Sequence, residues 1–195
     1  CGVWGGGRSP PIAEKFGDFG ILQIDAHCDL RKSYEDFVYS HASIMYNALE
    51  EIPKLKKLVQ VGVRDYSLSE WQYISESNGR VVTFFDKDIK RRQYEGTTWK
   101  QITDDIIREL PENIFLSFDI DGLDPKLCPN SGTPVQGGFE TDQVFYLLTK
   151  IMESGKRFLG FDLCEVGSTG ENDWDSNVGA RVLFKLCNIL TAANQ

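Results

Sequence analysis

Residues 113–125 read NIFLSFDIDGLDP, an apolar run that ends in closely spaced aspartates. The run has the length and the Ile, Leu and Phe content of a buried strand. Asp119 and Asp121 are therefore expected at the carboxyl end of this strand, where they would be partly buried. An extended chain would put both side chains on one face. Buried carboxylates must be paired, protonated or bound to a metal. This stretch predicts a central strand with a polar site at its carboxyl end.

Further apolar runs alternate with amphipathic stretches along the rest of the chain. The expected strands are 20–25, 57–63, 80–85, 113–119 and 157–162. The expected helices are 41–51, 68–77, 98–109, 139–154 and 173–192. Strand and helix in alternation predict an α/β fold with a mainly parallel sheet. There is no internal repeat or linker, so residues 1–195 are expected to form one domain.

The connection before the first of these strands is short. About a dozen residues, including Pro10 and Pro11, separate Gly5–Gly7 from the strand at 20–25. A crossover between parallel strands needs about a dozen or more residues, mostly helix. Two prolines leave little room for that helix.

Composition excludes several classes of protein. Among 195 residues, 41% are hydrophobic and 26% are charged, which is the profile of one globular domain. A net charge of -8 argues against a nucleic-acid surface, and no apolar run approaches the ~20 residues of a membrane span. The five cysteines form no CxxC pair, so we expect reduced thiols in a cytoplasmic protein. They are Cys1, Cys28, Cys128, Cys164 and Cys187.

A second acidic motif follows the strand at 20–25. Asp25, His27 and Asp29 alternate in Asp-Ala-His-Cys-Asp, so an extended segment would point all three the same way. The alternative is a polar loop whose aspartates cap the next helix. Asp25 and Asp29, together with Asp119 and Asp121, make four carboxylates. Two divalent ions would balance their formal charge. Oxygen-rich ligands with few imidazoles suit Mn²⁺ better than Zn²⁺, and paired metals generate hydroxide from water near neutral pH.

Four ordered motifs resemble the signature set of the ureohydrolases, the arginase and agmatinase relatives. They are DAHCD at 25–29, SFDIDGLDP at 117–125, GTPVQGG at 132–138 and GFDLCEV at 160–166. The resemblance implies the three-layer αβα fold that this family shares with the deacetylases. Family members carry an N-terminal region with further strands that is absent from the sequence, so residues 1–195 are expected to be one partial ureohydrolase domain.

The resemblance also implies a ligand set for two Mn²⁺ ions per chain. Asp25 and Asp119 would bridge the two ions. His27 and Asp121 would complete one site, and Asp29 would ligate the other.

Three more residues acquire roles by the same resemblance. His41 matches a histidine that shuttles protons, Glu165 an acid that holds the substrate guanidinium, and Thr133 a threonine lining the same pocket. The chemistry is coherent, because a guanidinium is a poor electrophile. Its NH groups must be held bidentately while a metal-bridging hydroxide attacks its carbon, and the leaving amine needs a proton. Without the family, His41 would be a surface or helix-start histidine and Glu165 a structural ion-pair partner.

Two other features have structural interpretations. The pair Arg64-Asp65, after the second strand, is expected to be structural. Four aromatic residues are expected to pack in the core rather than to hold a cofactor. They are Phe145, Tyr146, Trp174 and Phe184.

One position departs from the family pattern. The family carries a further ligand histidine in a G-G-x-H-S motif, and residues 5–9 read GGGRS, with Arg8 in its place. A guanidinium stays protonated and cannot ligate a metal. Three explanations compete: residues missing around 7–11, a genuine substitution that leaves one metal, and a metal-deficient, non-catalytic homologue. We favour the first explanation.

The loop at 30–40, LRKSYEDFVYS, is more similar to agmatinase-like members than to arginases. We therefore expect a small guanidino substrate, agmatine, hydrolysed to putrescine and urea. Arginase, guanidinobutyrase and formiminoglutamase activity stay open, because Arg31 and Lys32 could meet a carboxylate. A single-zinc deacetylase would need a tandem His pair, and none occurs. The resemblance also implies a homo-oligomer.

Overall fold

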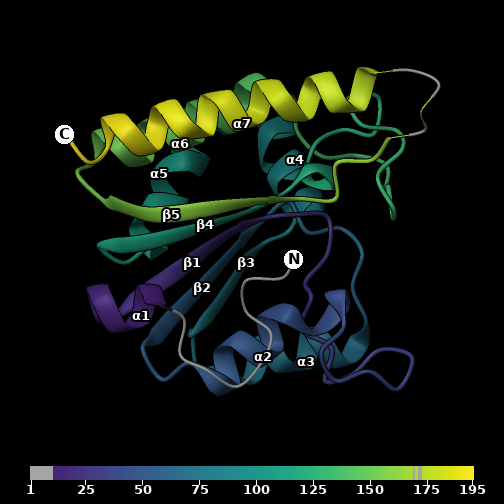
Figure 1. Ribbon diagram of the computed structural model, residues 1–195. Helices are drawn as coiled ribbons and strands as arrows, with labels where there is room; N and C mark the ends of the chain where they lie inside the picture. The colour runs from purple at the N-terminus through teal and green to yellow at the C-terminus, as the bar shows by residue number, and fades with distance from the viewer. Residues whose placement is uncertain (1–10, 169, 171–172) are drawn as a thin grey trace.

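A computed structural model describes residues 11–168, 170 and 173–195. In this part of the chain five strands form one all-parallel sheet in the order β3-β2-β1-β4-β5 (Figure 1). The strands are β1 (Phe19–Ile24), β2 (Leu55–Val61), β3 (Val81–Phe84), β4 (Asn113–Asp119) and β5 (Arg157–Cys164). Each lies within a few residues of its predicted range, so the predicted α/β class and parallel sheet are confirmed.

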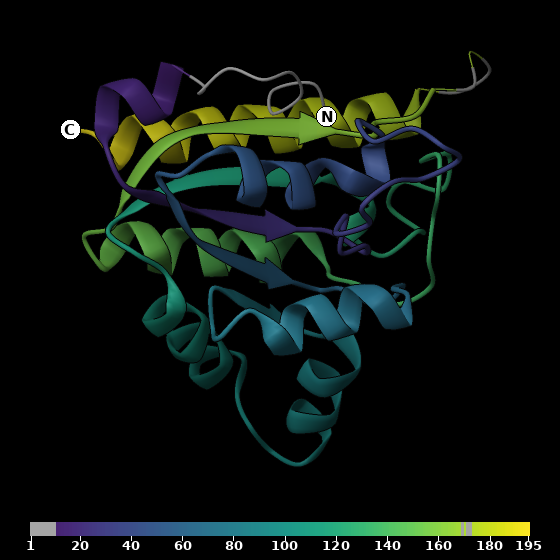
Figure 2. The ribbon, with the colours of Figure 1, turned by 90° about the horizontal axis from the view of Figure 1, so that it is seen from below.

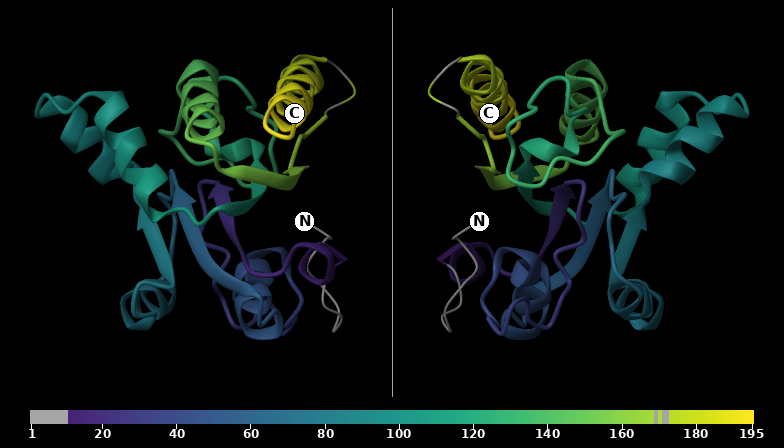
Figure 3. Two further views of the ribbon diagram at one scale, coloured as in Figure 1. Left: turned by 90° about the vertical axis from the view of Figure 1, so that its left-hand side faces the viewer. Right: turned by 90° about the vertical axis from the view of Figure 1, so that its right-hand side faces the viewer.

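Helices cover both faces of the sheet and make three layers (Figures 1 and 3). α2 (Ile44–Glu51) and α3 (Leu68–Glu76) lie on one face, as Figure 2 shows from their side. The other face is covered by α4 (Asp86–Tyr94), α5 (Trp99–Glu109), α6 (Thr141–Glu153) and α7 (Trp174–Ala192). The remaining helix, α1 (Pro11–Phe16), precedes β1.

Local sequence explains where several helices begin. Ser67 and Glu70 form a capping box at the start of α3, and Thr98 and Gln101 form another at the start of α5. Each box satisfies backbone N–H groups that have no partner within the helix. The predicted starts at 68 and 98 are therefore close to the observed ones.

The sequence did not predict α1 or α4. α1 begins at Pro11, where a proline is tolerated because the first helical N–H needs no partner. A short helix thus fits where we expected little room. α4 reads DKDIKRRQY, and Ile89 is its buried apolar residue, so it lacks the apolar stripe on which the other helix predictions rested. The predicted helix at 41–51 is split into a 3-10 turn, η1 (His41–Ser43), and α2.

Each face of the sheet has its own apolar cluster. Residues such as Ile24 and Phe118 pack against α4–α7, and neighbours of opposite orientation such as Ile21 and Phe115 pack against α2 and α3. The alternation follows from the two-residue period of a strand. Because both faces are covered, the strands are nearly continuous apolar runs.

The core assignment of the aromatic residues on α7 was wrong. Trp174 is 54% exposed and Phe184 is 67% exposed. The buried face of α7 carries Val178, Val182 and Leu186 instead. Helical spacing selects these three for the core and turns Phe184 away from it.

Two expectations from composition can be compared with the described residues. No helix among them is long and apolar enough to cross a membrane. Cys28, Cys128, Cys164 and Cys187 are free thiols, as predicted, and Cys1 lies outside the described residues.

Candidate metal centre

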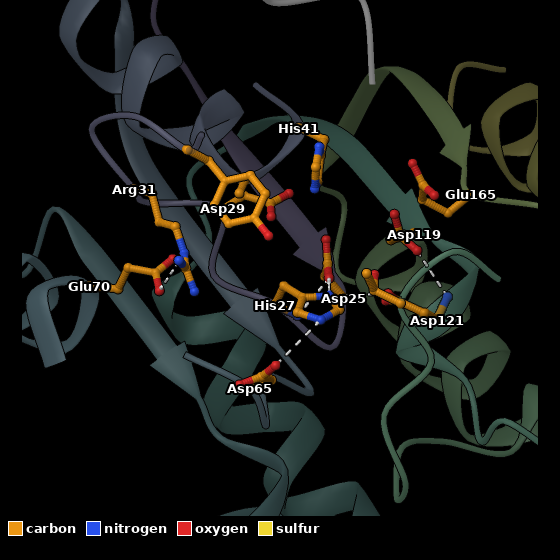
Figure 4. Close-up of a pocket in the computed structure, with 13 residues that line it drawn as sticks. Asp25, His27, Asp29, Arg31, His41, Asp65, Glu70, Asp119, Asp121 and Glu165 are labelled. Atoms are coloured by element: carbon orange, nitrogen blue, oxygen red, sulfur yellow. Dashed lines mark hydrogen bonds and ion pairs between the residues drawn. The ribbon is translucent and has the colours of Figure 1, made fainter. Parts of the chain in front are cut away.

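All eight predicted site residues line one cavity of about 140 Å³ at the carboxyl ends of the strands (Figure 4). Parallel strands bring their carboxyl ends to one edge of the sheet, which is where open α/β sheets bind ligands. The residues come from four segments: those at or after the carboxyl ends of β1, β4 and β5, and the turn η1. They are Asp25, His27, Asp29, His41, Asp119, Asp121, Thr133 and Glu165.

Three of these side chains form a tight cluster. His27 Nδ1 lies 3.1 Å from Asp121 Oδ2 and 3.4 Å from Asp25 Oδ1. The ligand atoms of Asp25, His27 and Asp121 all lie within 4.8 Å of one another. Two carboxylates and an imidazole in this arrangement can hold a divalent cation.

Backbone hydrogen bonds fix the two aspartates of this cluster. Asp25 Oδ1 accepts a hydrogen bond from the His27 backbone N–H at 2.6 Å, and Asp121 Oδ1 accepts one from the Ala26 N–H at 3.1 Å. The second bond joins the segment after β1 to the segment after β4. The cluster is thus built by the contact between two neighbouring strand ends.

Alternation along an extended chain is not what places Asp119 and Asp121. β4 ends at Asp119 and the chain enters a 3-10 turn, η2 (Ile120–Gly122). Asp119 caps this turn, since its Oδ1 accepts a hydrogen bond from the Asp121 N–H at 2.9 Å. Both carboxylates line the cavity, but only Asp121 belongs to the tight cluster.

Asp29 also reaches the cavity by another route than predicted. Its backbone has φ 53°, so the segment from Asp25 is not extended throughout. Its carbonyl accepts hydrogen bonds from the N–H groups of Met45 and Tyr46, which ties this turn to the first residues of α2. The left-handed conformation is tolerated by Asp better than by most residues. Asp29 lines the cavity outside the tight cluster.

Burial makes the acidic groups costly to ionise. It raises the pKa of Asp25 to about 6, and it raises the pKa of Asp29 and of Asp119 well above the usual range. Asp121 is the exception: burial opposes ionisation there, but the adjacent His27 imidazole lowers its pKa overall. Burial alone would lower the pKa of His27, whereas Asp121 and Asp25 raise it to about 10. The protein surrounds this spot with negative charge that a cation would stabilise.

One unpartnered oxygen tests whether a metal fits. Asp121 Oδ2 is buried and accepts no hydrogen bond, although His27 Nδ1 is at ion-pair distance from it. A buried carboxylate oxygen without a hydrogen bond is costly. It points to the same place as the Asp25 and His27 ligand atoms. The donor set therefore fits a divalent cation with a preference for oxygen ligands.

The other three predicted residues surround this cluster. His41 begins η1 and its ring contacts the edge of Tyr34, with 5.5 Å between centroids. Glu165 follows β5 with φ 58° and is exposed. Thr133 lies in the loop after η2, next to Gly132, where a Cβ would come within 3.1 Å of Glu165 Oε2. Figure 4 shows His41 directed toward Asp25 and His27, and Glu165 at the end of β5.

The profile of the arginase family matches residues 9–188. This chain belongs to the arginase family. It is 37% identical over 159 residues to an N(1)-aminopropylagmatine ureohydrolase of Thermus thermophilus. This match covers 81% of this chain and 50% of the relative. It is 30% identical over 149 residues to an agmatinase of Halalkalibacterium halodurans, covering 76% and 47%. The chain spans about half the length of the curated relatives it matches.

Solved structures with the same fold are known. The proclavaminate amidino hydrolase from Streptomyces clavuligerus superposes with a TM-score of 0.76 at 22% identity, covering 93% of this chain and 58% of that one. The agmatine ureohydrolase of Thermoplasma volcanium gives 0.69 at 25% identity, covering 90% and 55%. The three-layer arrangement predicted from the resemblance is confirmed.

Arg8, the departure from the arginase-family pattern, lies outside the described residues. Its three explanations therefore stay as they were. The site described above rests on residues of other segments and is independent of them.

Further polar side chains line the cavity, and the sequence had indicated a substrate contact only for Arg31. They are Arg31, Tyr34, Asp65 and Glu70. Glu70 is buried and accepts hydrogen bonds from the backbone N–H groups of Leu30 and Ser67. The Ser-x-x-Glu pattern of a capping box at 67–70 was the available signal in the sequence, but only the fold shows that Glu70 also holds the loop after Asp29.

The neighbours Arg64 and Asp65 have different roles: Arg64 is structural, and Asp65 lies at the cavity. Arg64 donates hydrogen bonds to four backbone carbonyls, those of Gly62, Asp121, Leu123 and Val135, which confirms a structural role. The Asp65 carboxylate lies 3.9 Å from His27 Nε2, on the opposite side of the ring from the tight cluster. A purely structural interpretation of Asp65 was therefore incomplete.

Proposed function

We propose that the protein is a manganese-dependent ureohydrolase that cleaves a guanidino C–N bond, with agmatine as substrate and putrescine and urea as products. The convergence of Asp25, His27 and Asp121 on one spot carries this proposal. Asp29 and Asp119 line the same cavity and would complete the ligand set for two ions. Bound metal would supply the activated water that attacks the guanidinium carbon.

The chain's own residues would bind the substrate and move a proton. Glu165 would accept two N–H groups of the guanidinium, since a carboxylate matches this planar fork. Gly132 leaves that carboxylate free of a neighbouring side chain. Thr133 would line the same side of the cavity. His41 is exposed at the cavity and would protonate the leaving amine.

Charge at the cavity favours a substrate with a second cationic group. Apart from the proposed ligands, the lining includes the acids Asp65, Glu70 and Glu165 and one guanidinium, Arg31. Arg31 Nε lies 3.8 Å from Glu70 Oε2, so the two charges offset each other. Asp65 and Glu165 are left to attract cations at two places. Agmatine has a guanidinium at one end and an amine at the other, whereas 4-guanidinobutyrate has a carboxylate in place of the amine.

A second candidate substrate is N(1)-aminopropylagmatine. The relative of Thermus thermophilus at 37% identity is named for hydrolysis of this compound. It carries one more amine than agmatine, which suits the same acidic cavity. Assembly into a homo-oligomer stays a prediction.

The test is urea release by the full chain, with Mn²⁺, from agmatine, N(1)-aminopropylagmatine, arginine and 4-guanidinobutyrate. We expect either of the first two to give a higher kcat/KM than arginine. A higher value for 4-guanidinobutyrate would mean that Arg31 meets a carboxylate, and the agmatine assignment would be wrong. No urea from any substrate, together with no bound metal, would support a metal-deficient, non-catalytic homologue.

A variant pair tests the role of Glu165. Glu165→Gln removes the charge that would hold the guanidinium and should lower kcat/KM at least tenfold without changing Mn²⁺ content. Glu140→Gln is the matched control, because Glu140 is an exposed acid at the start of α6 that does not line the cavity. Equal activity of the two variants would overturn the assignment of Glu165.

A further inference from the structure

A row of polar side chains crosses the sheet below the candidate metal centre. Parallel pairing places Gln23 beside Gln60 and Ser117, Gln60 beside Thr83, and Ser117 beside Asp162. All five residues lie in strands that are otherwise largely apolar. We call them the polar row: Thr83, Gln60, Gln23, Ser117 and Asp162. Paired positions in neighbouring strands point to the same face, here the face covered by α2 and α3.

Three members of the polar row form a hydrogen-bonded chain that ends on Asp25. Thr83 Oγ1 donates to Gln60 Oε1 at 2.8 Å, and Gln60 Nε2 donates to Gln23 Oε1 at 2.7 Å. Gln23 Nε2 then donates to Asp25 Oδ2 at 2.9 Å. Every donor points toward Asp25, so the three bonds polarise one another in the same direction.

The orientation of both amides is determined by their surroundings. Gln60 Nε2 also donates to the Cys28 carbonyl at 2.7 Å, and Gln23 Nε2 faces the Asp25 carboxylate and the His27 carbonyl. Carbonyl and carboxylate oxygens only accept hydrogen bonds. Rotating either amide by 180° would put oxygen against oxygen. The chain therefore has one hydrogen-bonding pattern.

Burial shows that these amides do more than fill space. Gln23 is 1% exposed and Gln60 is 0% exposed. An apolar side chain of similar size would pack there without the desolvation of an amide. The amides are tolerated because each has partners at both of its polar atoms.

These hydrogen bonds hold the Asp25 carboxylate from the side of the sheet and leave its other side facing the metal centre. Asp25 Oδ2 receives Gln23 and Oδ1 receives the His27 N–H, so the carboxylate is held from two directions. Its Oδ1 also lies 3.4 Å from His27 Nδ1. A carboxylate fixed in this way does not have to be reoriented when a cation binds.

We infer that Gln23, oriented by Gln60 and Thr83, is a positioning residue that holds the Asp25 carboxylate toward the metal centre. This inference rests on the proposed function for its metal, but the hydrogen-bonded chain itself does not. Gln23 acts through Asp25 and contacts neither the cavity nor a substrate in it. Outer partners of metal ligands commonly contribute 10- to 100-fold to affinity.

The first experiment measures Mn²⁺ affinity of the full chain by titration calorimetry. Gln23→Met keeps the side-chain length, removes the donor to Asp25, and should weaken the Kd about tenfold. Thr83→Val is nearly isosteric, removes the outermost donor, and should weaken it by a smaller factor in the same direction. It keeps the test available if Gln23→Met does not fold.

The matched control is Thr103→Val. Thr103 on α5 is buried, and its Oγ1 has no hydrogen-bond partner, so the same substitution there breaks no chain. Its Kd should equal that of the wild type. A structural role alone would change the melting temperature of Gln23→Met and Thr83→Val while leaving the Kd of both variants unchanged. That result would overturn the inference.

A second experiment needs no metal. In a ¹H–¹⁵N spectrum of the metal-free chain, the side-chain amide signals of Gln23 and Gln60 are identified by their loss in Gln23→Met and Gln60→Met. We expect both pairs to exchange with D₂O far more slowly than exposed glutamines, and Asp25→Ala to accelerate the Gln23 pair. Fast exchange of the Gln23 amide in the wild type would overturn the inference. Slow exchange with no Mn²⁺ binding by the wild type would instead overturn the proposed function.

Discussion

Two neighbouring rows of residues cross the sheet one position apart, and their chemistry is opposite. The polar row faces α2 and α3. The next residue of each strand faces the other way, toward α4–α7, and is apolar in all five strands. We call these residues the apolar row: Phe84, Val61, Ile24, Phe118 and Leu163.

The difference separates two tasks of the same strands. The apolar row contributes to stability, because its side chains leave water and pack against four helices. The polar row contributes little by burial, since its hydrogen bonds replace equivalent ones to water. The polar row instead orients carboxylates: Gln23 donates a hydrogen bond to Asp25, and Ser117 Oγ donates one to Asp162 at 2.9 Å. Substitutions on the two sides should therefore change different measurements.

The largest effect is expected on the side of the apolar row. Leu148 on α6 is 0% exposed within the cluster that includes this row. Leu148→Ala should lower the free energy of unfolding by about 2–5 kcal/mol, through lost burial and the cavity that remains. Urea denaturation measures this. The Kd for Mn²⁺ of the folded variant should be unchanged, and a weaker Kd would mean that the two sides are not separable.

Two aspartates, one in the metal centre and one outside it, share the same kind of unsatisfied polar atom and allow a direct comparison. Asp121 and Asp86 each have a buried carboxylate oxygen without a hydrogen-bond partner, but Asp86 begins α4, where Lys90 Nζ is 4.0 Å away. Mn²⁺ at 100 times its Kd should stabilise the wild type by about 2.7 kcal/mol. Asp121→Asn should lose this metal-dependent rise in melting temperature and Asp86→Asn should keep it. A full rise in Asp121→Asn would exclude Asp121 as a ligand.

Arg64 allows a test of a cation used only for structure. Its guanidinium serves four carbonyls from three loops, including that of Asp121. Arg64→Met should lower the free energy of unfolding by about 2 kcal/mol, because buried carbonyls lose a charged donor. Arg64→Lys should restore part of it, since an ammonium cannot reproduce the planar fork. If urea unfolding shows Arg64→Met within about 0.5 kcal/mol of the wild type, these bonds are not structural.

The smallest effect is expected in cysteine labelling. Cys128 lies in the cluster on the α4–α7 side, Cys28 in that on the α2–α3 side between His27 and Asp29, and Cys187 is exposed. Burial raises the pKa of Cys128 to about 12 and also raises the pKa of Cys28. The thiolate is the reactive form, so at pH 8 iodoacetamide should modify Cys187 before Cys28 and Cys128.

The same labelling responds to pH and to metal. Because its pKa is raised, modification of Cys128 should keep increasing as the pH rises beyond 9. Mn²⁺ should slow modification of Cys28 a few-fold and leave Cys128 unchanged, because a bound ion would hold the segment on both sides of Cys28. Peptide mass spectrometry quantifies each thiol. Equal protection of Cys28 and Cys128 would indicate a global rather than a local effect of the metal.

Several features of this protein could be predicted from local sequence. The central strands β1 and β4 are largely apolar runs buried on both faces, and β4 was placed at its observed bounds because the run from Ile114 to Phe118 is interrupted only by Ser117 before it ends at Asp119. α5 and α6 have clear apolar stripes and were found within two residues. α4 was not, because a helix that buries chiefly Ile89 has almost no periodic signal.

The candidate site was predicted as a set of residues but not as a geometry. Asp25, His27 and Asp121 could be named because their motifs are local. Their contact depends on the Ala26 N–H bonding to Asp121 across 95 positions of sequence. The alternation of side chains along an extended chain also predicted that Asp29 and Asp119 would join the same cluster. The left-handed turn at Asp29 and the 3-10 turn after Asp119 place them elsewhere in the cavity.

The sequence by itself determined the fold class and the chemistry that gathers at the strand ends, because apolar runs and carboxylate spacing are properties of short segments. Only the tertiary structure decided which residues act together. Gln23, Gln60 and Thr83 each look like an isolated polar residue in an apolar strand, and parallel register joins them into one chain that ends on Asp25. Register is set by packing between segments far apart in sequence, and a shift of one residue would have put the apolar row under the site instead.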